Sequence, residues 1–156
     1  MFEKIALLAT LGVGVAGGYF LPRSPAPEPA SPGTTEVTLS RSGDGHFYAN
    51  AEVNGKSVRF LVDTGASAVA LSEKDAAAVG IKVDPSEFEY FGDGAAGMVR
   101  GKEVRLSKMS VDGIAEDNVD AVVVANGDVS LLGMPFLNRL DEVIIRRSEM
   151  TFRKAS

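Results

Sequence analysis

The residue of this chain best placed to do chemistry is an aspartate that directly follows an apolar strand. It stands in the segment RFLVDTGASAVAL, where Asp63 comes after three apolar residues and Gly65 follows it closely. An Asp-x-Gly sequence after a strand often serves only to turn the backbone. An ionised carboxylate at a buried strand end is costly, however, unless another group shares or solvates its charge. The segment therefore allows two interpretations, a turn or a functional carboxylate, and its apolar surroundings favour the second.

The composition removes most other catalytic groups. The 156 residues include no cysteine, which excludes thiol nucleophiles, disulfides and cysteine-ligated metals. The chain has a single histidine, His46, which excludes a metal site made of several histidines. A catalytic serine triad would have to combine His46 with Ser67 or Ser72, and neither serine lies in the G-x-S-x-G sequence typical of such nucleophiles. A net charge of −5 argues against a nucleic-acid-binding protein. Catalysis is therefore expected to rest on carboxylates or hydroxyls, with no metal and no organic cofactor.

Hydrolysis of a neutral amide needs both a base and an acid, which one carboxylate does not supply. Two carboxylates held close together cannot both ionise, so one acts as a base and its partner as an acid at the same pH, as in aspartic proteases. The chain has one Asp-Thr-Gly segment, so the second carboxylate must come from another chain. A two-fold homodimer that sets Asp63 beside its symmetry mate would provide the pair.

Three segments of different composition divide the chain. Within residues 1–21, the uncharged run IALLATLGVGVAGGYFL is near the lower length limit for a membrane span. We expect a transmembrane anchor there, with a cleaved signal peptide as the competing interpretation and a buried core helix behind both. Residues 22–36 hold five of the seven prolines and are expected to form an extended linker. Residues 37–156 are then long enough for one domain with its own core.

Alternation of apolar and polar residues predicts an all-β domain with one or two short helices. The pair Asn54-Gly55 separates two alternating runs, 46–53 and 56–62, and predicts a hairpin with a type I′ turn. The other predicted elements are a helix capped by Ser72 and ended by Gly80, a mobile glycine-rich hairpin or lid over 88–101, strands over 102–111 and 114–125, a strand stopped at Gly133 with a helix opening at Pro135, and a closing hairpin of 142–147 with 149–154.

Residues 46–156 resemble a retropepsin-type, single-domain aspartic protease, in particular the bacterial membrane-anchored members of that family. FLVDTGAS matches the family signature around its catalytic aspartate. The stretch from Gly92 to Gly97 falls where the family has its flap, and VSLLGMPFLNRL matches the later segment that ends in a glycine and a helix. An Asp-Thr-Gly triplet alone is a weak signal, but the three features in this order are specific.

The resemblance implies a closed, barrel-like β fold that acts as a two-fold homodimer on a peptide or protein substrate. Asp63 falls on the catalytic aspartate, and Thr64 on the residue whose hydroxyl bonds across the two-fold axis. Gly65 would let the backbone approach the two aspartates closely, and Gly133 is the glycine of the later segment that supports the site. The flap, which would contact the substrate, has three candidates for its tip: Gly92, Gly94 and Gly97.

Two positions after the aspartate differ from other branches of the family. Ala66 stands where two-domain pepsins carry a hydroxyl that bonds the carboxylate, and where retroviral members carry alanine. Without that hydrogen bond the charged carboxylate is less favoured, so we expect activity at mildly acidic rather than strongly acidic pH. Ser67 and Ala68 stand where retroviral members often carry acidic residues, which implies different contacts at the ends of the substrate.

Two hypotheses of different classes follow for the function. The first is an aspartic endopeptidase, in which Asp63 and its mate activate a water that attacks a peptide carbonyl. The alternative is a catalytically inactive dimeric module of the same fold that binds a peptide or protein in its groove. The intact Asp-Thr-Gly segment favours the enzyme, and Asp63→Asn discriminates the two because it should stop only turnover.

The remaining predictions concern the location of the protein and its other polar side chains. An N-terminal anchor with only a short segment on the cytoplasmic side would hold the domain at the inner membrane of a bacterial cell, on the periplasmic side. Three aromatic residues either line a groove or simply pack: Tyr48, Tyr90 and Phe91. Three acidic residues resemble a cation site only loosely and are expected to form a solvated turn: Glu116, Asp117 and Asp120.

Overall fold

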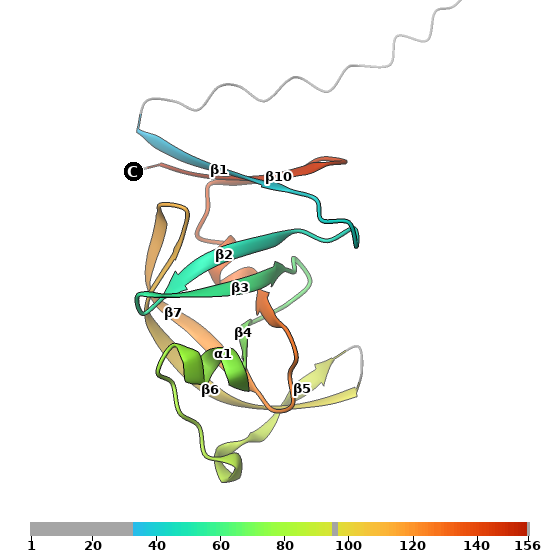
Figure 1. The fold of residues 1–156 in the computed structure, drawn as a ribbon, viewed down its shortest axis with the longest axis vertical. Coiled ribbons are helices and arrows are strands. Elements are labelled where there is room, and N and C mark those ends of the chain that lie inside the picture. Colours follow the sequence, from blue (N-terminus) through green and yellow to red (C-terminus); the bar gives the residue numbers. More distant parts are fainter. Residues whose placement is uncertain (1–32, 95–96, 156) are drawn as a thin grey trace, which may run out of the picture.

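The computed structural model describes residues 33–94 and 97–155 (Figure 1). The predicted anchor within 1–21, and most of the linker predicted for 22–36, lie outside these residues. In the part of the chain that is described, no helix has the length and apolar character needed to cross a membrane. The first strand, β1 (Thr34–Ser40), begins inside the segment predicted to be a linker.

Six strands close a barrel, and a hairpin extends from it (Figure 1). The strands follow the order β2-β3-β8-β4-β7-β6, and pairing of β2 with β6 closes the ring. Their bounds are β2 (Tyr48–Val53), β3 (Lys56–Val62), β4 (Val69–Ser72), β6 (Gly97–Val111), β7 (Ile114–Val124) and β8 (Ser130–Leu132). β5 (Glu89–Gly94) pairs with β6 outside the ring. The helices are α1 (Glu73–Ala78), α2 (Met134–Leu137) and the 3₁₀ turn η1 (Pro85–Glu87). The prediction of an all-β, barrel-like fold with two short helices is confirmed.

A second, three-stranded sheet joins the two ends of the described chain. Its order is β1-β10-β9, with β9 (Glu142–Ile145) and β10 (Glu149–Ala155), and it lies across the top of the barrel in Figure 1. One face of this sheet is buried and joins the apolar core through Val37, Leu39, Met150 and Phe152. On the other face, the Arg153 guanidinium pairs with Glu36 at 2.6 Å and with Glu142 at 3.0 Å. The hairpin of β9 and β10 was predicted from the sequence, whereas β1 was not.

Two short sequence signals account for the β2–β3 hairpin and for the start of α1. Asn54 and Gly55 both have positive φ, 51° and 79°, as a type I′ turn requires. The Ser72 hydroxyl accepts a hydrogen bond of 3.1 Å from the Asp75 amide and so caps α1. These two predictions are confirmed, and they fix the register of β2 with β3 and the point at which β4 turns into α1.

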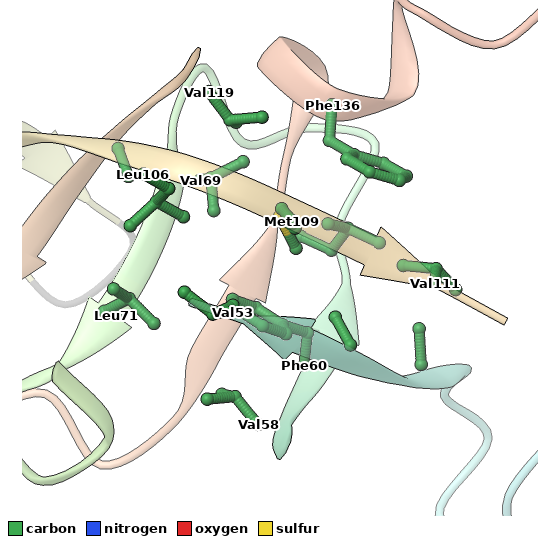
Figure 2. Packing of buried hydrophobic residues seen from close by; sticks show 14 of the residues in the cluster. Val53, Val58, Phe60, Val69, Leu71, Leu106, Met109, Val111, Val119 and Phe136 are labelled. Atoms are coloured by element: carbon green, nitrogen blue, oxygen red, sulfur yellow. The ribbon is translucent and has the colours of Figure 1, made fainter. Parts of the chain in front are cut away.

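Side chains from most strands of the barrel meet in one apolar core. Figure 2 shows Phe60, Met109 and Phe136 packed together, from β3, β6 and α2, and all three are fully buried. The buried Ser130 hydroxyl donates to Asp75 at 2.6 Å and accepts from the Ser72 amide at 3.1 Å. Among the described residues, no buried side-chain nitrogen or oxygen lacks a hydrogen-bond partner. This network ties β8 to the start of α1 without the penalty of an unsatisfied polar group.

Glu116 corrects the prediction made for the acidic residues of β7. Its side chain is buried, and its carboxylate pairs with Lys154 of β10 and, at 3.6 Å, with Arg139 beyond α2. Arg139 also donates to the carbonyl oxygens of Asp117 and Asn118. Glu116 therefore links the barrel to α2 and to the terminal sheet, and it does not belong to a solvated turn. Within 33–94 and 97–155, no three acidic or histidine side chains form a group suited to a metal ion.

We expect the fold to lose stability as the pH falls below about 4.5. In the folded chain, hydrogen bonds lower the pKa of three exposed carboxyls: Asp44 through the His46 amide, Asp84 through Ser86, and Glu87 through an amide of the same turn. Each such group stabilises the fold above its ordinary pKa, which is 3.8 for Asp and 4.5 for Glu, and this stabilisation is lost as the pH falls through the lower folded value.

Thermal unfolding followed by circular dichroism from pH 7 to pH 3 measures this effect. The melting temperature should be nearly constant down to pH 5 and decrease below pH 4.5, with a smaller decrease in Asp84→Asn. A melting temperature that rises on acidification would contradict the assignment.

Candidate active site

Asp63 and Gly133 follow the matching ends of two neighbouring strands. β3 and β8 are parallel, with Val62 beside Leu132, so the chain leaves both strands at the same edge. The Asp63 amide donates to the Leu132 carbonyl oxygen at 3.1 Å and continues the pairing by one residue. The structure thus brings together two segments that the sequence holds far apart.

Gly133 supports the loop that carries Asp63 because it has no side chain. A Cβ at this position would overlap the Ala68 carbonyl oxygen and lie 2.7 Å from that of Ala66. The φ of Gly133 is −100°, which any residue can adopt, so lack of space and not backbone strain requires glycine here. The next amide, that of Met134, donates to the Ala66 oxygen at 2.9 Å. The start of α2 therefore fixes the position of the Asp63 loop through this hydrogen bond.

The Asp63 carboxylate is partly buried and is oriented by its own loop. Its Oδ1 accepts a hydrogen bond of 2.8 Å from the Gly65 amide, and a Cβ on Gly65 would lie only 3.2 Å from that oxygen. Thr64 is exposed, and no hydrogen bond within the described chain involves its hydroxyl. A single chain thus leaves both the carboxylate and this hydroxyl accessible to a further group.

A hollow of about 550 Å³ lies between the Asp63 loop and the β5–β6 hairpin. Asp63, Gly65 and Ala66 form one side of it. Ser67, Ala68 and the hairpin residues 91–94, which include Asp93, also line it. Apolar side chains from β4, β6, β7 and β8 and their connections complete the wall: Ala70, Val99, Val122, Val124, Val129 and Leu131. The arrangement is a carboxylate at the edge of an apolar groove, which suits an extended peptide better than a small charged ligand.

The glycine-rich segment forms the predicted hairpin, with paired strands up to its turn. Gly94 pairs with Gly97, and residues 95–96 between them lie outside the described residues. Gly92 and Gly94 line the hollow, whereas Gly97 does not. β6 runs without interruption from this hairpin into the barrel, so the hairpin is an extension of the sheet. The sequence predicted a mobile hairpin or lid in place of packed sheet. The hairpin is present, but its strands pair as part of the sheet, a continuity that the glycines did not indicate.

A family model described as "gag-polyprotein putative aspartyl protease" matches residues 49–139, more than half of the chain. This chain belongs to the retropepsin-like aspartic protease family. The match includes Asp63 and Gly133, and the resemblance inferred from the sequence is confirmed.

Two curated proteins are similar to this retropepsin-like chain. A protein encoded in the 5′ region of cobV in Sinorhizobium sp. is 39% identical over 127 residues, which cover 79% of this chain and 54% of that protein. A Rickettsia prowazekii protein is 36% identical over 104 residues, which cover 67% of this chain and 45% of the other. The chain therefore spans about half the length of the curated relatives it matches.

Two solved structures are similar to this chain. The crystal structure of a retropepsin-like aspartic protease from Rickettsia conorii superposes with a TM-score of 0.66 at 31% identity, covering 79% of this chain and 94% of that one. EIAV protease in complex with an inhibitor superposes with a TM-score of 0.51 at 17% identity, covering 64% and 91%. At that identity the second likeness concerns the fold alone.

His46, Tyr48 and Ser72 do not line the groove of this retropepsin-like chain. His46 is exposed, and no hydrogen bond of the described chain joins it to Ser67 or to Ser72. The Tyr48 hydroxyl donates to Asp44 at 2.8 Å. This arrangement gives no support to a serine-triad chemistry.

Of the three aromatic residues for which the sequence left open a place in a groove or simple packing, Phe91 lines the groove. A bulge between Tyr90 and Gly92 removes Phe91 from the β5–β6 pairing, and Phe91 lines the groove while Tyr90 does not. A Cβ on Gly101 would overlap Cγ2 of Val122, so the Val122 side chain packs closely against the backbone of β6 at this point. The sequence predicted the strand that became β7, but it did not show the bulge that turns Phe91 toward the groove.

Proposed function

We propose that this chain is an aspartic endopeptidase whose catalytic site forms between two copies, each of which supplies one Asp63. The observation that carries the proposal is the position of Asp63, partly buried at the edge of an apolar groove that the β5–β6 hairpin covers. Membership of an aspartic protease family supports it. The fold alone would not, because one fold hosts many functions.

The chemistry follows from two carboxyl groups that share one proton. The ionised Asp63 of one chain takes a proton from a water, whose oxygen attacks the carbonyl carbon of the peptide bond, while the protonated Asp63 of the other chain gives its proton to the carbonyl oxygen. In the resulting diol, the Asp63 that took the water proton gives it to the amide nitrogen, and the other Asp63 takes a proton from a diol hydroxyl. The C–N bond then breaks and leaves a carboxylic acid and an amine. The Gly65 amide, 2.8 Å from Oδ1, fixes the orientation of the carboxylate.

The groove supports binding of an extended polypeptide. The hairpin contributes Gly92 and Gly94, which leave backbone groups uncovered by side chains. Backbone amides and carbonyls at the edge of a sheet pair readily with an added strand. The wall of β7, with Val122 and Val124, suits apolar side chains next to the bond to be cut.

Three observations support assembly as a homodimer. One carboxylate per chain is insufficient for the reaction above, and Thr64 is exposed beside it with no partner among the described residues. The structural relatives belong to a family whose retropepsin-like members act as homodimers. We therefore assign to Thr64 the hydrogen bond across the two-fold axis.

This proposal predicts that hydrolysis depends on protein concentration. Specific activity toward a peptide library at pH 4 to 7 should rise with concentration and level off where sedimentation shows the dimer to be complete. Activity per chain that stays constant where the protein sediments as a monomer would refute the shared site. A folded dimer that binds peptides but cleaves none would favour the inactive binding module.

A further inference from the structure

A second hollow continues the groove beyond Phe91. It encloses about 380 Å³ and shares Ser67, Ala68 and Phe91 with the hollow at Asp63. Its other lining residues come from the middle of β6 and β7 and from α2: Glu103, Val104, Arg105, Asp120, Ala121 and Pro135. An extended polypeptide that passes Asp63 can therefore continue past Phe91 into this second hollow.

The wall of the groove changes from apolar to charged along the same two strands. Alternation along β7 puts Asp120 on the same face as Val122, which lines the hollow at Asp63. On β6, Glu103 pairs with Val122 and Arg105 pairs with Asp120. The wall formed by β7 is therefore apolar at Val122 and charged at Asp120, two positions away on the same face.

The charge left without a partner in the second hollow is negative. Arg105 is already engaged, because its Nε and Nη2 lie 2.8 Å and 2.7 Å from Oδ1 of Asp120. Glu103 is exposed and forms no ion pair within the described residues, and its neighbour Lys102 pairs with Glu87 at 3.4 Å. A ligand side chain that enters here therefore meets an uncompensated carboxylate.

We propose that Glu103 is a specificity-determining residue that selects polypeptides with a lysine or arginine side chain a few residues from the bond to be cut. The inference rests on the proposed peptidase function. The aliphatic part of such a side chain would lie along Phe91, and its charge would reach Glu103. Because Glu103 is exposed, the preference is modest, about fivefold in kcat/KM, and weakens as salt is added.

The test uses peptides that differ at one residue. A lysine is moved through the positions two to four residues on each side of the cleaved bond and compared with its neutral analogue norleucine and with glutamate. Hydrolysis is measured with the wild-type chain, with Glu103→Gln and with Glu52→Gln, an exposed carboxylate on β2 away from the groove. Binding of the same peptides is measured in parallel by fluorescence anisotropy in the Asp63→Asn background.

We expect the wild type to prefer lysine over norleucine at one position and to disfavour glutamate there. The ratio should fall toward one in Glu103→Gln and stay unchanged in Glu52→Gln. Equal cleavage of lysine and norleucine peptides at every position, or a preference that survives in Glu103→Gln, overturns the inference while the peptidase stands. If no peptide is cleaved but Asp63→Asn binds lysine peptides in a Glu103-dependent way, the inference stands and the proposed catalysis fails. Absence of both cleavage and binding overturns both.

Discussion

Replacement of Asp63 by asparagine is expected to abolish peptide hydrolysis while the domain stays folded. Asparagine keeps an oxygen that can accept the 2.8 Å hydrogen bond from the Gly65 amide, so the loop needs no rearrangement. It removes the group that takes and gives the proton, however, at both positions of a homodimer. The rate should fall by about 10⁴-fold or to the detection limit, the upper end of what a positioned acid–base group contributes.

The matched control for this variant is Asp112→Asn. Asp112 lies in the exposed turn between β6 and β7 with a φ of 44°, a conformation that asparagine tolerates well. Hydrolysis by this variant should equal that of the wild type, and circular dichroism should show both variants to be folded. Residual activity of Asp63→Asn within tenfold of the wild type would exclude Asp63 as the catalytic group.

The second large effect is expected for Gly133→Ala. The added methyl group would overlap the Ala68 carbonyl oxygen and crowd that of Ala66, so either the loop of Asp63 or the start of α2 must move. Neither neighbour is the end of a flexible side chain, and overpacking against backbone of this kind costs about 3 kcal/mol of folding stability. The shift also displaces Asp63, so activity should fall more than stability alone explains.

Denaturant unfolding and peptide hydrolysis, measured on the same preparations, test this prediction. Gly43→Ala is the control, because a Cβ at Gly43 meets no atom within 4 Å. We expect a clearly lower unfolding midpoint for Gly133→Ala and an unchanged one for Gly43→Ala. Equal midpoints for the two variants would show that the loop has more room than its geometry indicates.

The sequence predicted those features that short segments encode by themselves. The turn at Asn54-Gly55 and the cap at Ser72 depend on neighbours within four residues, and both occur as predicted. The segments of Asp63 and Gly133 were identified through their resemblance to a family, since nothing local joins them. Only the parallel pairing of β3 with β8 brings these two segments into contact.

Features that depend on distant partners were missed or misjudged. β1 follows a proline-rich stretch, and its partner β10 is at the other end of the chain, so its pairing has no local signal. Glu116 was expected in solvent because three acidic residues stand close together, but Lys154 and Arg139 allow it to be buried. The bulge at Phe91, and with it the extent of the groove, depends on the pairing of β5 with β6.

The predictions for the N-terminal segment stay predictions. The anchor within 1–21, the linker over 22–36 and the periplasmic location rest on composition, and residues 1–32 lie outside the described part of the chain. The charged continuation of the groove at Glu103, by contrast, comes from the structure and has no counterpart in the sequence patterns.

The central claim is that one catalytic site needs Asp63 from two chains, and mixing wild-type protein with Asp63→Asn tests it most directly. Total protein is held constant at a concentration where the dimer is complete, and the two forms are allowed to exchange before hydrolysis is measured. If both carboxyl groups are required, only wild-type dimers are active, and an equal mixture should retain about one quarter of the wild-type rate. A rate of about one half, linear in the wild-type fraction, would mean that each chain works alone and would contradict the shared site.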